Sequence, residues 1–123
     1  MIMQKNKYES YKLGVCDSAP DLSADKEVPL SKHPAEIVTV LIAGSGGQYA
    51  WGYRVCWADG RTSYRNPSFS LGIFRDEHDA LLYGIGYMLS FEAYFQTETV
   101  SNIRTAESRH SATSLPLFED PEP

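Results

Sequence analysis

The sequence predicts an α+β protein, in which a three-stranded antiparallel meander carries one long helix across one face. Two observations support this class. A β-branched run is followed by two segments in which large apolar and polar residues alternate, a pattern typical of strands. A longer segment then places apolar residues at helical spacing. The length of 123 residues fits one domain with flexible termini.

The first 35 residues show neither a helical nor a strand period, and three prolines interrupt any regular element there. We expect residues 1–35 to form a mostly disordered or loosely docked arm. Whether this arm adds a strand to the sheet stays open at the level of sequence. A domain over residues 36–110 and a flexible acidic tail over residues 111–123 should follow.

The three strands are expected at Glu36–Gly44, Tyr49–Ala58 and Arg61–Asn66. A glycine-rich connection joins the first two strands. Asp59-Gly60 joins the second and third, because both residues tolerate the positive φ angles of a type I′ turn. A two-residue loop fixes the register, and it places Arg54 opposite Arg65.

This register predicts two sheet faces of different chemistry, because side chains alternate along a strand. Arg54, Arg61 and Arg65 share one face as candidate anion-binding or nucleic-acid-binding residues. The other face carries large apolar residues that should pack against the helix: Tyr53, Val55, Trp57 and Tyr64.

The arginine pair Arg54 and Arg65 should be destabilising when directly cross-strand, so a negative group is expected beside it. A nucleic-acid phosphate could supply that charge, since arginine holds phosphate in a bidentate manner. An acidic partner protein could also supply it. So could the chain's own arm, through Asp21, Asp25 or Glu27.

The long helix should begin at the N-cap Asp76 and run to about Gln96. Gly84 and Gly86 each cost about 1 kcal/mol in a helix interior, so we expect them at a close approach to the sheet. A second, weaker helix is expected from near Thr97–Thr99 to His110. The apolar stripe of the long helix comprises Ala80, Gly84, Tyr87, Met88, Phe91 and Phe95.

The order of these elements resembles the first half of the ribonuclease H fold and the HicB-type antitoxin core, a shortened version of that half. The segments GSGGQYAWGYRV, ADGR and DEHDALLYGIGYML carry the resemblance, which implies a βββα topology. Ribonuclease H chemistry needs clustered carboxylates for two metal ions. The first strand holds no aspartate after Glu36, and the histidines and cysteines are scattered. We therefore expect no enzyme activity, no metal site and no cofactor.

The tail contains an isolated apolar motif, Ser114-Leu115-Pro116-Leu117-Phe118. It is similar to the peptide with which bacterial replication and repair proteins dock on the β sliding clamp. Leu115, Leu117 and Phe118 match its hydrophobic anchors, whereas Ser114 replaces its glutamine. The motif predicts docking on a protein partner such as the sliding clamp. The alternative is a hydrophobic clasp on the chain's own domain.

Charge and composition limit the function classes. The net charge is −5, but residues 49–75 carry +3, so the remainder carries −8. No segment has the ~18 consecutive apolar residues of a membrane span, and the two cysteines fit a reducing, cytoplasmic setting. The sequence thus predicts a non-enzymatic bacterial or mobile-element accessory protein near DNA transactions, either monomeric or homodimeric. The alternative is an antitoxin-like or inhibitor protein that binds another protein without nucleic-acid contact.

Overall fold

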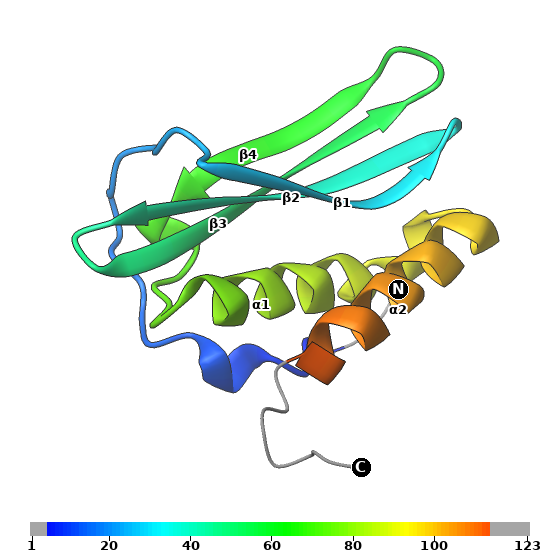
Figure 1. The fold of residues 1–123 in the computed structure, drawn as a ribbon. Helices are drawn as coiled ribbons and strands as arrows, with labels where there is room; N and C mark the ends of the chain where they lie inside the picture. The colour runs from blue at the N-terminus through cyan, green and yellow to red at the C-terminus, as the bar shows by residue number, and fades with distance from the viewer. Residues whose placement is uncertain (1–4, 114–123) are drawn as a thin grey trace, which may run out of the picture.

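The computed structural model describes residues 5–113 and contains one four-stranded antiparallel sheet with two helices on one face (Figure 1). The predicted α+β class is confirmed, whereas the predicted number of strands is too low by one. The strands lie in the sheet in chain order. In sequence the elements are η1 (Glu9–Tyr11), β1 (Lys26–His33), β2 (Glu36–Ser45), β3 (Gln48–Trp57), β4 (Thr62–Ser68), η2 (Phe69–Leu71), α1 (Glu77–Ser90), η3 (Glu92–Tyr94) and α2 (Thr97–Thr113).

The additional strand, β1, lies in the arm for which a disordered or loosely docked state was expected. It pairs with β2 from Lys26 to His33, with one irregularity at Leu30, and Leu30 is only 5% exposed within the core. The strand was not predicted because Pro29 lies within it, and a proline usually interrupts a strand. Because β1 is an edge strand, a proline can face its free side without removing a hydrogen bond of the sheet.

The residues before β1 are also attached to the domain. Gly14 forms a β-bridge with Ile73, and the Leu22 amide donates to the Pro67 carbonyl over 2.8 Å. The Asp25 amide then donates to β2 over 2.8 Å. The segment therefore passes from the β4 edge of the sheet to the β1 edge, and the loosely docked arm of the prediction is not observed.

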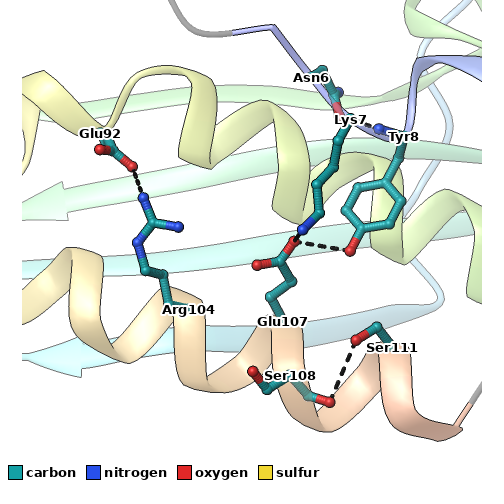
Figure 2. A network of polar contacts seen from close by, with 8 residues as sticks. All are labelled: Asn6, Lys7, Tyr8, Glu92, Arg104, Glu107, Ser108 and Ser111. Carbon is teal, nitrogen blue, oxygen red and sulfur yellow. Dashed lines mark hydrogen bonds and ion pairs between the residues drawn. The ribbon is translucent and has the colours of Figure 1, made fainter.

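A polar network attaches the first described residues to α2 (Figure 2). The Tyr8 hydroxyl donates to Glu107 Oε2 over 2.8 Å, and Lys7 Nζ lies 2.9 Å from the same oxygen. Glu107 is 8% exposed, so these two partners compensate a nearly buried carboxylate. Burial raises the pKa of the Tyr8 phenol, and the Glu107 hydrogen bond raises it further. One turn earlier in α2, Arg104 forms an ion pair with Glu92 of η3.

Helix α1 begins as predicted, with Asp76 as its N-cap. The Asp76 carboxylate accepts a hydrogen bond from the Asp79 amide over 2.8 Å. The helix ends at Ser90, however, and not near Gln96. A 3-10 turn follows and reverses the chain, so that α2 returns antiparallel to α1 (Figure 1). The second helix is therefore confirmed, and it is longer than expected.

One of the two helical glycines has the predicted role. A Cβ atom at Gly84 would lie 2.9 Å from Val40 and 3.1 Å from Trp51, so Gly84 allows α1 to approach the sheet closely. Gly86 instead faces the N-terminal segment, where a Cβ atom would lie 2.7 Å from Tyr8. Trp51 is 1% exposed at the centre of the core, which confirms that the aromatic face of the sheet packs against the helices.

The predicted register of the β3–β4 hairpin is wrong by one residue. The loop has three residues, because Trp57 and Arg61 close it through a 2.9 Å bond from the Trp57 amide to the Arg61 carbonyl. Gly60 takes a positive φ of 93°, as expected for the last residue of a three-residue loop. Asp59 stabilises this turn by accepting the Arg61 amide over 3.0 Å.

The register shift moves the side chains from Arg61 to Arg65 to the opposite face from the one predicted, before a second register shift near the end of β4. Arg65 lies opposite Tyr53, and Arg54 lies opposite Tyr64. Arg61 and Arg65 therefore lie on the helix-facing side of the sheet, and Arg54 lies on the open side. The predicted face with three arginines does not exist, and Tyr64 is 59% exposed, away from the core.

Candidate functional site

Each of the three arginines of the predicted site has a different environment, and Arg54 is the one with a partner from the N-terminal segment. Arg54 Nη2 lies 2.7 Å from Glu27 Oε1 on the open face of the sheet, and this hydrogen bond lowers the pKa of Glu27. One of the three acidic residues considered within the arm therefore neutralises Arg54. Asp21 and Asp25 do not contribute, because they accept hydrogen bonds from Asn66 and from a backbone amide of β2.

Arg61 is held at the tip of the β3–β4 hairpin. Its guanidinium lies 4.7 Å from the centre of the Trp57 ring, a cation–π contact. Its Nε atom is 2.8 Å from Asp59 Oδ2. The Arg61 backbone amide and then its side chain lower the pKa of Asp59. The Arg61 side chain is still 68% exposed, so it can meet a further negative group.

Arg65 lies two residues further along the same side of β4. Within residues 5–113 it makes no ion pair with a carboxylate. Burial raises the pKa of Tyr87, and the charge of Arg65 acts in the opposite direction, which places Arg65 near that phenol. Arg65 is therefore a cation at the border of an aromatic region and still lacks a counter-charge.

That aromatic region contains a groove of about 210 Å³ between the β3–β4 hairpin and the end of α1. It exists because α1 ends at Ser90 and the chain turns away through η3, so no helix covers β4. Ser63 contributes to its wall from β4, between Arg61 and Arg65. We call it the aromatic groove, and its aromatic lining consists of Tyr53, Trp57, Tyr87, Phe91, Tyr94 and Phe95.

The aromatic rings support one another along the groove. Tyr53 and Tyr87 are stacked with centroids 6.0 Å apart, and Phe91 lies 5.1 Å from Tyr87. Tyr94 continues the row at 6.2 Å from Phe91 and is 61% exposed. Such contacts restrain the rings beyond simple burial. The groove is therefore a preformed apolar surface with one exposed end.

A buried carboxylate fixes two walls of the groove. Glu36 is 4% exposed, and its two oxygens accept from the Trp57 indole N–H over 3.3 Å and from the Gln96 amide over 2.9 Å. Trp57 belongs to β3, and Gln96 immediately precedes α2. Glu36 therefore holds the hairpin and the η3–α2 corner at a set separation.

The outer side of β4 is a free strand edge, since β4 is the last strand of the sheet. The Trp57–Arg61 hydrogen bond shows that Arg61 directs its carbonyl group toward β3. Because such pairs alternate in an antiparallel ladder, Ser63 does the same. The backbone groups of Thr62 and Tyr64 must therefore point outward. Within residues 5–113, the N-terminal segment pairs with this edge at Pro67 and Ser68, beyond the groove.

Among the described residues, three larger hollows are present, but their charged groups are already paired; the smallest of the three, of about 470 Å³, contains Arg75, the partner of Asp76 and Asp79. One, of about 680 Å³, lies between η3 and α2 and contains Arg104, the partner of Glu92. Another, of about 650 Å³, lies between β1 and α1 and contains Lys26, which is 2.9 Å from Glu77. The aromatic groove is the hollow that combines an apolar floor with an arginine still available for an anion.

The remaining expectations from the sequence concern metal ligands, membrane spans and the motif in the tail. In the described part of the chain, no three His, Cys, Asp or Glu side chains cluster as metal ligands would. Neither α1 nor α2 is both long and apolar enough to cross a bilayer, judged over residues 5–113. Leu115, Leu117 and Phe118 lie outside the described residues, so their docking role stays a prediction. Comparison with protein families, with curated proteins and with solved structures finds no match to this chain.

The groove itself was not predicted from the sequence. Tyr87, Phe91 and Phe95 were assigned to the core stripe of the helix, and Ser63 and Tyr94 were not considered. The available signal was the Asp-Gly turn, which also fits a three-residue loop. With that loop, Arg61 and Arg65 would have been placed on the aromatic side of the hairpin.

Proposed function

We propose that this protein is a non-enzymatic binding module for an extended, acidic segment of a protein partner. The segment would lie along β4 and insert one large apolar side chain into the aromatic groove. The observation that carries the proposal is that Arg61 and Arg65 flank Ser63 beside both the groove and a free strand edge. These are the three parts that peptide binding by strand addition needs: backbone partners, a side-chain pocket and a charge for specificity.

The free edge favours a peptide over a nucleic acid. Thr62 and Tyr64 offer outward amide and carbonyl groups in strand geometry, which a second strand can satisfy and a nucleotide backbone cannot. The net charge of −5 also disfavours a long polyanion. A role near DNA transactions, which the sequence suggested, relied on three arginines on one face. It stays a prediction that now depends on Arg61 and Arg65.

The experiment is a fluorescence anisotropy titration with dye-labelled ten-residue peptides. One peptide contains a Phe followed two residues later by an Asp, and its counterpart has Lys in place of that Asp. We expect the Phe–Asp peptide to bind the full chain and the Lys peptide to bind at least about tenfold more weakly, as loss of a close charge pair predicts. The substitution Arg61→Glu with Arg65→Glu should reverse this preference.

A matched control carries Lys32→Glu and Arg109→Glu, which change the net charge equally at exposed positions of β1 and α2. This control should bind the Phe–Asp peptide as the unmodified chain does. A single-stranded oligonucleotide of twenty thymidines tests the other class of partner. Binding of that oligonucleotide through Arg61 and Arg65, with no binding of either peptide, would show that the proposal is wrong.

A further inference from the structure

We propose that the occupant of the aromatic groove is the segment Leu115–Asp120 of a second copy of this chain, exchanged reciprocally between two copies. This inference rests on the proposed function, because it uses the same groove and strand edge. It goes further by naming the bound segment, its register and its source.

The segment has the chemistry that the groove requires. Leu115, Leu117 and Phe118 are large apolar residues, and Glu119 and Asp120 follow them directly. The groove has an aromatic floor, and two arginines lie at its border. An apolar anchor followed two residues later by a carboxylate can therefore meet the aromatic rings and the guanidinium group of Arg61. This complementarity in both polarity and charge favours the segment over the other parts of the chain.

The proline in the segment restricts the antiparallel register. Residues that bond to β4 must lie opposite Thr62 and Tyr64, whose backbone groups point outward. Pro116 has no amide N–H, so it must lie at a position that does not bond to β4. Among the registers that remain, the one that places Phe118 opposite the groove residue Ser63 brings Leu117 opposite Tyr64, where it makes the backbone bonds.

The side chains follow from that register, because directly opposite residues in an antiparallel pair share a face. Phe118 lies opposite Ser63 and therefore points to the aromatic groove. Asp120 lies opposite Arg61, on the same side as Phe118. Tyr64, which is 59% exposed on the open face, gains Leu117 as a cross-strand neighbour.

The groove of the same copy is out of reach for these anchors. Helix α2 starts beside the groove residue Phe95 and has 17 residues, so Thr113 lies about 25 Å away along the helix axis. His78 accordingly contacts the His110 carbonyl over 2.7 Å near the opposite end of α1. The five residues from Thr113 to Phe118 span at most about 18 Å when extended. Phe118 can therefore fill the groove only of another copy.

The test is sedimentation velocity of the full chain over a range of concentrations. We expect a reversible monomer–dimer equilibrium for the unmodified chain. Phe118→Asp should weaken dimerisation at least about tenfold, because it removes the aromatic anchor from the segment. Arg61→Glu with Arg65→Glu should do the same. The control with Lys32→Glu and Arg109→Glu should dimerise normally.

A mixture of the segment variant and the groove variant tests directly whether the segment of one copy binds the groove of the other. The Phe118→Asp chain retains an intact groove, and the Arg61→Glu, Arg65→Glu chain retains an intact segment, so an equimolar mixture should form a heterodimer with one contact in place of two. Tyr94→Ala, at an exposed side chain of the groove, serves as a second groove variant should the double arginine variant not fold. Circular dichroism of each variant checks the fold.

Three outcomes would overturn the inference. They are a monomer at every concentration of the unmodified chain, a dimer that persists in Phe118→Asp, and the absence of a complex between the mixed variants. If the chain stays monomeric while the Phe–Asp peptide still binds the groove, the inference fails and the proposed function stands. If neither the peptide nor the segment binds, both are wrong.

Discussion

Gly84 sets the separation between α1 and the sheet at the centre of the core. We predict that Gly84→Ala lowers the free energy of unfolding by about 1–2 kcal/mol. The better helix propensity of alanine contributes about 1 kcal/mol, but overpacking against Val40 and Trp51 costs about 1–3 kcal/mol, since neither side chain can move away easily. Urea unfolding followed by circular dichroism measures the change.

The control for this prediction is Ser101→Ala, at an exposed position of α2. It gains helix propensity without new contacts, so it should leave stability unchanged or raise it slightly. A stabilising effect of Gly84→Ala would show that the helix does not approach the sheet as closely as described.

Tyr8 supports a second prediction, which concerns alkaline pH. Burial and the Glu107 hydrogen bond raise the pKa of the folded Tyr8 phenol above its unfolded value of 10.0. The folded protein thus keeps a proton that the unfolded chain releases. The stabilisation is complete below pH 10 and is lost as the pH rises above it. Tyr8→Phe should cost about 1–2 kcal/mol at pH 8 through the lost hydrogen bond, and its stability should decline less steeply above pH 10.

Urea titrations at pH 8 and pH 11 separate the two effects. Tyr83 and Tyr87 also have pKa values raised by burial, so the Tyr8→Phe protein keeps part of the alkaline decline. Equal declines in the two proteins would mean that Tyr8 is not coupled to Glu107 in solution.

Local and non-local residues differ in how well the sequence predicted them. Asp76 caps α1 as expected, because an N-cap depends only on residues three or four positions away. The sheet face predicted for Arg65 was wrong, because that face depends on whether the loop at Asp59-Gly60 has two residues or three. Both lengths suit an Asp-Gly pair. A difference of one residue in the loop reverses the faces of the whole strand, so the pattern alone could not place the arginines.

Strand β1 is the largest difference between the predicted and the observed elements. If it belongs to the core, Leu30→Ala should lower the free energy of unfolding by about 2–4 kcal/mol, since Leu30 is 5% exposed. Leu13→Ala is the matched control, because Leu13 is 62% exposed in the same N-terminal segment, and its effect should stay within about 0.5 kcal/mol. A thermal or urea transition measures both. Equal, small effects of the two substitutions would indicate that β1 is only loosely docked on the domain.

The other elements follow from their sequence periods to different extents. The β-branched run of β2 and the alternation of β3 were sufficient to predict both strands. Helix α1 was predicted six residues too long, because Phe91 and Phe95 continue its apolar stripe. In the structure these residues form the groove beyond the helix end. The spacing of apolar residues alone cannot show whether a side chain packs under the sheet or lies beside the edge of the sheet, beyond the end of the helix.

At the scale of the whole molecule, the core extends beyond the domain predicted over residues 36–110. Leu30 of β1 and Tyr8 of the N-terminal segment belong to it, together with Ile103 of α2. A core of this extent does not need a second copy for its own burial. Self-association therefore depends on the groove and the strand edge.

The proposed dimer should weaken as salt is added. Its contacts include arginine–carboxylate pairs at an exposed border, and such pairs are screened over about 10 Å at 0.1 M ionic strength. We predict that the dimerisation constant falls several-fold between 50 mM and 500 mM NaCl in sedimentation experiments. An association that strengthened with salt would instead indicate a purely apolar contact.

The most direct test of the central claim is a titration of the Phe118→Asp chain, whose own segment is impaired, with a dye-labelled peptide of residues 112–123. We predict saturable binding with one peptide per chain, lost when Arg61→Glu and Arg65→Glu are added. Absence of binding, or equal binding to the two proteins, would contradict the claim that β4 and the aromatic groove hold this segment.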